Sequence, residues 1–153
     1  MLAAGATAPS FSLTDVSGQT CELTEVLARG PVLLALYKAS CPVCQMTLPY
    51  LERISKGSLQ VLAISQDDPA VTERFQKIFG LSLRTLFDRE EDGYPVSNAF
   101  GITHVPSLFL VEPDGTLSLA DVGFRKSRLE QLGSRAGVPV FRQEDHVPEW
   151  KAG

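Results

Sequence analysis

The chain has 153 residues, of which 44% are hydrophobic and 21% charged, a composition typical of one globular domain with its own core. The formal net charge of -4 and the lack of a Lys- or Arg-rich run argue against nucleic-acid binding. No apolar stretch is long enough to cross a bilayer, and the first residues lack a signal-peptide pattern, so we expect a cytoplasmic protein. An exported form with a trimmed leader is the alternative.

The first half of the chain predicts a hairpin, a strand, a helix and a second strand. Alternating apolar and polar residues around Ser17-Gly18 indicate the hairpin, and two continuous apolar runs indicate strands buried on both faces. Between these runs the apolar residues recur with a helical period. The four elements occupy residues 11–23, 32–37, 41–56 and 59–65.

The second half begins with the segment DDPAVTERFQKIFG, which has the chemistry of a helix. Asp67 or Asp68 can cap it, Pro69 suits its first turn and Gly80 its end. A short strand, a helical turn, a hairpin and an amphipathic helix follow, at residues 84–88, 94–101, 107–122 and 127–137.

Strands that alternate with helices imply a parallel core, and the hairpin near the end adds antiparallel strands. We therefore predict an α/β fold with a mixed central sheet flanked by helices and a β-hairpin at the N-terminus. The domain should span residues 1–137. Residues 138–153 have no clear period and predict an extended tail.

Two of the three cysteines, Cys41 and Cys44, lie in the sequence YKASCPVC, where a buried strand meets a helix. The positive end of that helix favours a thiolate at Cys41, and Cys44 follows one turn later on the same side. Such a pair can exchange disulfides: Cys41 attacks, a mixed disulfide forms and Cys44 resolves it.

Other uses of the pair fit less well. A zinc site needs four ligands, and only Cys21, His104 and His146 remain to complete one, so we expect no metal. A purely structural disulfide would close too short a loop to constrain the chain. Cys21 is interpreted as a core thiol without a redox role, and no cofactor is expected.

Four segments, taken in order, resemble those of a known family. They are GATAPSFSLTDVSGQTCEL, VLLALYKASCPVC, LQVLAISQDD and AFGITHVPSLFLVEPDG. They are similar to the opening hairpin, the central strand with its CxxC turn, the next strand, and the cis-proline segment of thioredoxin-fold redoxins. Within these the chain resembles the peroxiredoxin-like branch, the alkyl hydroperoxide reductase/thiol-specific antioxidant group.

The resemblance implies roles for particular residues. Cys41 would be the nucleophile and Cys44 the resolving cysteine. Pro106 occupies the cis-proline position, and the backbone of Val105 would pair with a bound substrate strand. An ordinary trans proline at the start of a strand is the alternative.

The chain also departs from its relatives near the cysteines. Ser40 stands where thioredoxins usually carry Trp, and Ala35 stands where they often carry a buried carboxylate. The residue three before Cys41 is Lys38, where typical peroxiredoxins have a hydroxyl. These differences put both an efficient thioredoxin-type reductase and the usual peroxidase pocket in doubt.

Lys38 and His104 are candidates for tuning the reaction. Lys38 is expected to favour the Cys41 thiolate electrostatically, with a solvated lysine as the alternative. His104 would face the active-site groove and accept a proton during resolution, with a surface histidine as the alternative.

The leading hypothesis is a thiol-disulfide oxidoreductase or antioxidant redoxin that cycles a Cys41–Cys44 disulfide. Its substrate would be a protein or small-molecule disulfide, and its reductant an external dithiol or glutathione. One alternative is a thiol peroxidase that forms a Cys41 sulfenic acid with a peroxide. Another is a non-enzymatic module that binds peptides or senses redox state. The tail, with Trp150 as an apolar anchor, could contact a partner, or be a loose end.

Overall fold

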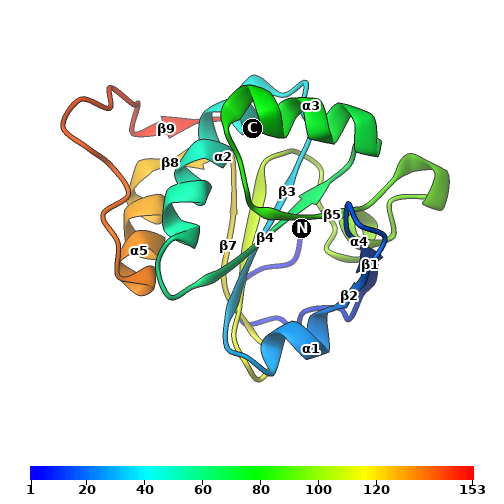
Figure 1. The fold of residues 1–153 in the computed structure, drawn as a ribbon. Helices are drawn as coiled ribbons and strands as arrows, with labels where there is room; N and C mark the ends of the chain where they lie inside the picture. The colour runs from blue at the N-terminus through cyan, green and yellow to red at the C-terminus, as the bar shows by residue number, and fades with distance from the viewer.

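The computed structural model describes all 153 residues and centres on a five-stranded sheet with the strand order β5-β4-β3-β6-β7 (Figure 1). Its strands are β3 (Val32–Tyr37), β4 (Gln60–Ser65), β5 (Arg84–Phe87), β6 (Ser107–Val111) and β7 (Leu117–Val122). Strands β3, β4 and β5 pair in parallel, whereas β6 pairs antiparallel with β3 and β7. The predicted mixed sheet is confirmed.

Helices cover both faces of this sheet. They are α1 (Leu23–Leu27), α2 (Pro42–Ser55), α3 (Pro69–Phe79), α4 (Pro95–Ala99) and α5 (Lys126–Ala136), with a short 3-10 helix, η1 (Glu90–Asp92). Alternate residues of β3 enter two different cores. Leu33 and Tyr37 pack with α2, α3 and α5, whereas Leu34 and Leu36 pack with α1, α4 and the N-terminal hairpin. None of the helices has the length and apolarity needed to span a bilayer.

The predicted hairpin near the N-terminus is present as β1 (Ser12–Thr14) and β2 (Thr20–Glu22), which pair antiparallel. Its turn is held by the Asp15 carboxylate, which accepts hydrogen bonds from the backbone N–H groups of Ser17 and Gln19, each at 3.0 Å. Leu13 and Cys21 point inward from the two strands into the core that covers β3.

Helix α3 begins and ends where the sequence predicts, but its cap differs. Pro69 occupies the first turn and Gly80, with φ of 63°, ends the helix in a left-handed conformation. Asp68 is the N-cap residue, yet its side chain makes no capping hydrogen bond. The expectation of an aspartate side-chain cap is wrong, because Asp67 instead reaches across to the backbone of Ala39.

The tail packs on the domain. Its last strand, β9 (Trp150–Lys151), pairs antiparallel with β8 (Phe124–Arg125), and Figure 1 shows the orange-to-red segment running from α5 back to this pair. The Asp145 carboxylate accepts hydrogen bonds from the Arg53 guanidinium of α2 at 2.5 and 3.3 Å. A Cβ at Gly123 would collide with the Lys151 carbonyl, so glycine permits the close approach.

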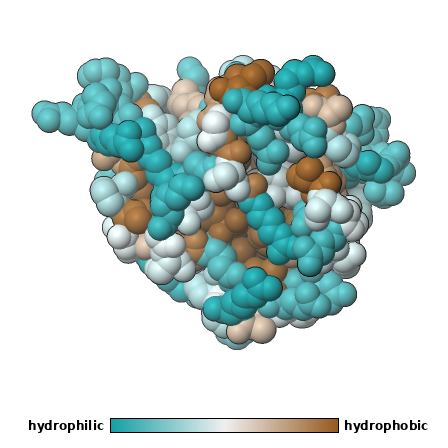
Figure 2. Space-filling view, viewed as in Figure 1, coloured by the Kyte–Doolittle hydropathy of each residue, from teal (hydrophilic) through white to brown (hydrophobic).

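The surface in the same view is largely hydrophilic, with apolar side chains visible at the top over α3 and in the middle of the view (Figure 2). Val71 and Ile78 of that helix are 38% and 69% exposed. Scattered exposed apolar residues are ordinary on a folded domain, so this feature does not by itself mark a binding surface.

Candidate functional site

Cys41 lies between the end of β3 and the start of α2 and is the N-cap residue of that helix. Its Sγ accepts a hydrogen bond from the backbone N–H of Cys44 at 3.3 Å. Pro42 fits the first turn because it has no N–H to leave unpaired. The thiol thus faces the unpaired N–H groups of a helix N-terminus.

Cys44 differs from Cys41 in burial. Cys41 is half-buried, whereas Cys44 is fully buried in the core formed with α2 and α5. Burial raises the pKa of the Cys44 thiol, and the neighbouring Cys41 and Asp67 raise this pKa further. The structure therefore brings the two predicted cysteines together with one reachable from solvent and the other held protonated beneath it.

The loop before β6 lies against Cys41. The Cys41 thiol donates a hydrogen bond to the Val105 carbonyl, with 3.5 Å between sulfur and oxygen. The Val105–Pro106 peptide bond is cis, as the resemblance implies. Two hydrogen bonds hold the loop: the Ser107 hydroxyl donates to the His104 carbonyl at 2.6 Å, and the Gly123 N–H donates to the Pro106 carbonyl at 2.8 Å.

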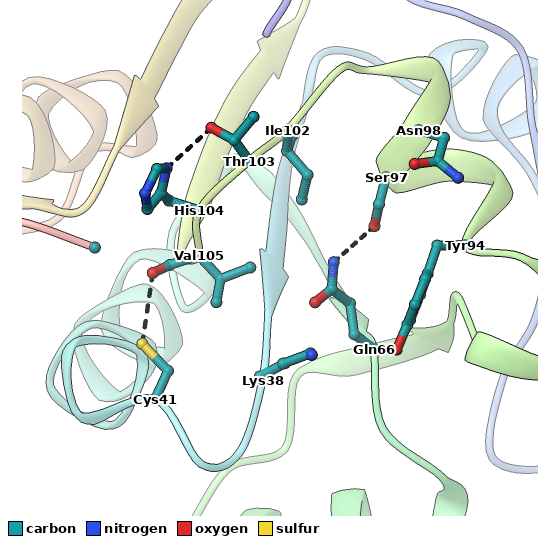
Figure 3. A pocket seen from close by; sticks show the side chains of 11 residues that line it. Lys38, Cys41, Gln66, Tyr94, Ser97, Asn98, Ile102, Thr103, His104 and Val105 are labelled. Carbon is teal, nitrogen blue, oxygen red and sulfur yellow. Dashed lines mark hydrogen bonds between the residues drawn. The ribbon is translucent and has the colours of Figure 1, made fainter.

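A pocket of about 410 Å³ opens beside the Cys41 sulfur, between the end of β3, helix α4 and the loop before β6 (Figure 3). We call it the Lys38 pocket. It is lined by Lys38, Cys41, Gln66, Tyr94, Ser97, Asn98, Ile102, Thr103, His104, Val105 and Gly153. Four of the six site residues predicted from the sequence line this one cavity, and the other two, Cys44 and Pro106, are buried.

Lys38 and His104 take different positions in the Lys38 pocket. The Lys38 side chain reaches into it toward Tyr94, with its Nζ 5.8 Å from the centre of the Tyr94 ring. His104 is exposed, and its Nδ1 lies 2.9 Å from the Thr103 hydroxyl (Figure 3). The roles predicted for both side chains stay predictions.

Asp67 belongs to the site although its sequence context suggested only a helix cap. Its carboxylate accepts a hydrogen bond at 2.7 Å from the backbone N–H of Ala39, two residues before Cys41. Burial raises the pKa of Tyr37 to about 12, and the charge of Asp67 contributes to this rise. In the sequence, only its position shortly after a buried strand pointed to the site, because ligands bind at the carboxyl ends of parallel strands.

The far wall of the Lys38 pocket is fixed by a buried carboxylate. Asp88 is fully buried and accepts hydrogen bonds from the backbone N–H groups of Val96 and Ser97 and from the Ser97 hydroxyl, at 2.9, 2.7 and 2.5 Å. The Ser97 oxygen in turn accepts from the Gln66 amide at 2.8 Å. Tyr94 precedes α4 with φ of 48°, a value uncommon outside glycine.

Residues 4–120 match the model of the AhpC/TSA family. The chain belongs to this family. Among curated AhpC/TSA relatives, the thiol-disulfide oxidoreductase ResA of Geobacillus thermodenitrificans is 31% identical over 119 residues, which cover 74% of this chain. The same alignment covers 66% of the length of ResA, just under two thirds.

Solved structures agree on the fold of this AhpC/TSA protein. The thioredoxin domain of a thiol-disulfide oxidoreductase from Bacteroides vulgatus superposes with a TM-score of 0.77 at 18% identity, covering 89% of this chain and 99% of that one. A putative thiol:disulfide interchange protein DsbE from Chlorobium tepidum gives a TM-score of 0.75 at 23% identity, covering 88% and 96%. The predicted thioredoxin-like fold is confirmed.

Proposed function

We propose that the protein is a thiol-disulfide oxidoreductase that cycles a Cys41–Cys44 disulfide. The observation that carries this proposal is the arrangement of the two thiols. Cys41 caps helix α2 at a pocket open to solvent, and Cys44 is buried one turn below it, with its N–H on the Cys41 sulfur. The names of the ResA relatives support the same reaction class.

The cycle begins at the reachable sulfur. The Cys41 thiolate attacks one sulfur of a substrate disulfide, forms a mixed disulfide and releases the other sulfur as a thiolate. Cys44 then loses its proton and attacks the Cys41 sulfur, which releases the second substrate thiol. The substrate gains two electrons, the protein is left with a Cys41–Cys44 disulfide, and an external dithiol or glutathione restores the reduced pair.

The substrate is best held as an extended chain beside Val105. Its carbonyl lies 3.5 Å from the Cys41 sulfur, so a main chain that pairs there places its disulfide next to the nucleophile. The alternative reaction, reduction of a peroxide through a Cys41 sulfenic acid, would need no such strand, and the family also leaves it open.

The test follows free thiols in the reduced protein after mixing with insulin and, separately, with hydrogen peroxide. Fast exchange with insulin, lost in Cys41→Ser, is expected. In Cys44→Ser the mixed disulfide should accumulate and be visible by mass spectrometry. Cys21→Ser is the matched control, because Cys21 lies in the core on the other face of the sheet. Rapid loss of thiols with peroxide but not with insulin would favour the peroxidase hypothesis over the oxidoreductase. A rate of thiol loss that Cys41→Ser leaves unchanged would overturn both hypotheses.

A further inference from the structure

The lining of the Lys38 pocket has an unusual charge balance for this protein. The whole chain carries a formal net charge of -4, yet the eleven residues around the pocket include Lys38 and His104 and no acidic side chain. The remaining polar side chains are amides and hydroxyls, from Gln66, Tyr94 and their neighbours, and Gly153, the last residue of the sequence, contributes backbone only. The cavity beside the nucleophile is therefore suited to a negative group.

Lys38 has no carboxylate partner of its own. Eight ion pairs link other cations of the chain to Asp or Glu, and none includes Lys38. Two carboxylates beside the site are already engaged in hydrogen bonds. Asp67 accepts the Ala39 N–H outside the pocket lining, and Asp88 is buried behind Ser97 with three donors.

The position of Lys38 is also constrained. It follows the fully buried end of β3, and its ammonium group lies against the Tyr94 ring, an arrangement in which a cation is attracted to the aromatic face. Tyr94 itself is held at the start of α4, which Asp88 caps. Figure 3 shows Lys38 between Cys41 and this wall. A carboxylate that met Lys38 would sit in the same cavity as the attacking sulfur.

We propose that the Lys38 pocket binds a carboxylate carried by the disulfide substrate, so that the protein prefers disulfides whose cysteine has an acidic neighbour. The proposal rests on the proposed function of Cys41 and names its substrate class. A volume of about 410 Å³ falls within the usual range for ligand pockets and accommodates a residue next to the substrate cysteine. An acidic peptide and a small disulfide with free carboxylates share this chemistry.

The experiment measures a preference in a single turnover of the reduced protein. Two peptides are compared, each with one cysteine joined to 4-thiopyridine and flanked by Glu in one peptide and by Gln in the other. Cys41 attacks the peptide sulfur and releases 4-thiopyridine, whose absorbance gives the rate; Cys44 then displaces the peptide thiol. Each rate is divided by that of dithiothreitol with the same peptide, which removes the intrinsic difference in reactivity.

The wild-type protein should react faster with the Glu peptide, and this preference should weaken as salt is raised. Lys38→Met should lower the Glu-to-Gln rate ratio by about three- to fivefold, the upper range for a partly exposed ion pair. Lys38→Arg should keep most of the ratio. Lys77→Met removes the same charge from the exposed face of α3, outside the pocket, and should leave the ratio unchanged.

The ratio separates this proposal from a general effect of Lys38 on the Cys41 thiolate, which would change both rates by the same factor. Equal rates for the two peptides, or a ratio that Lys38→Met does not move, would overturn the carboxylate site while leaving the exchange reaction intact. Failure of the proposed function gives a different result, because then the rate of 4-thiopyridine release would not depend on Cys41 for either peptide. Glutathione disulfide is a third substrate in this experiment. If Lys38→Met lowers its reaction rate as much as that of the Glu peptide, small anionic disulfides are also substrates. If the rate with glutathione disulfide does not change, the site is specific for acidic peptides.

Discussion

At the scale of single residues, the two cysteines that we propose react share a helix turn but not an environment. Cys41 is the N-cap residue of α2 and faces the Lys38 pocket, whereas Cys44 points into the core beneath it. The first position leaves a sulfur that a substrate can reach, and burial at the second raises the pKa of the thiol and so favours its protonated form. These are the two environments that the proposed nucleophile and the proposed resolving cysteine need.

Burial of Cys44 predicts that the reduced protein loses stability in alkali. The folded-state pKa of this thiol is raised above its unfolded value of about 8.5. Its contribution to stability is therefore fully present below about pH 8.5 and is lost as pH rises above that value. Cys44→Ala should be less stable than wild type at pH 7, and the gap should shrink by up to about 1.4 kcal/mol per pH unit above pH 8.5.

Urea unfolding of the two reduced proteins from about pH 7 to pH 10 checks this expectation. Comparing the variant with wild type cancels the contributions of Tyr37 and Cys21, whose pKa values burial also raises. Stability curves that stay parallel over the whole range would contradict the assignment of the alkaline loss to Cys44.

Asp67 should stabilise the loop that leads to Cys41. Asp67→Ala leaves the Ala39 N–H without its 2.7 Å partner, and an unsatisfied, partly buried donor costs about 1 to 2 kcal/mol. Asp67→Asn keeps an oxygen acceptor and should cost less than half as much. The loss of unfolding free energy in each variant is measured from the shift of its urea unfolding midpoint, with the slope of the transition unchanged. Equal losses in the two variants would mean that the hydrogen bond to Ala39 does not carry the effect.

The cysteine pair could be predicted because its signals are local: the CxxC spacing and the change from a strand period to a helical one lie within a few residues. Asp67 could not, since its partner Ala39 is 28 residues away in the sequence. An aspartate before Pro69 also fits a helix cap, which is the interpretation that the sequence favoured and the structure overturned.

At the scale of elements, the same distinction holds. Strands β3 and β4 are continuous apolar runs, and α3 and α5 carry their own stop signals in Gly80 and Gly137, so their positions follow from the sequence. The docking of the tail does not. It depends on pairs such as Arg53 and Asp145, which are 92 residues apart, and on a two-residue strand that has no period of its own.

The tail should detach in acid. The Arg53 guanidinium lowers the pKa of Asp145 to about 2, with help from the Arg142 N–H. A carboxyl whose folded-state pKa is depressed contributes stability above its unfolded value of about 3.9 and loses it as pH falls through the folded value. Docking should therefore weaken between about pH 4 and about pH 2. Trp150, the single tryptophan of the chain and part of β9, reports this by its fluorescence.

In Asp145→Asn the acid transition in Trp150 fluorescence should be reduced, and limited proteolysis should cut the tail more readily at neutral pH. Glu130→Gln is the matched control, because Glu130 is an exposed carboxylate of α5 outside every ion pair. Far-UV circular dichroism reports the rest of the fold. A transition that is identical in all three proteins would show that Asp145 does not hold the tail.

At the scale of the whole molecule, the site forms where three distant parts of the chain meet. The junction of β3 and α2 supplies Cys41, the loop before β6 supplies Val105, and the tail brings Gly153 beside both. A Cβ built on Gly153 would lie 2.7 Å from the Val105 carbonyl oxygen, so the tail is in direct contact with the group that we propose pairs with substrate.

This contact predicts that the tail restricts access for extended substrates. A chain that stops at Glu149 lacks β9 and exposes the Val105 carbonyl, because Gly153 no longer lies against it. Its single-turnover rate with insulin should rise several-fold, since a substrate strand then pairs at Val105 without displacing the tail. The neutral disulfide 4,4′-dithiodipyridine, which needs no main-chain pairing, should react with Cys41 at nearly the same rate in both proteins. If shortening the chain raises the rates with both disulfides equally, Cys41 has become more reactive and the groove has not become more open. If it raises neither rate, the tail leaves the Val105 site accessible in the full chain.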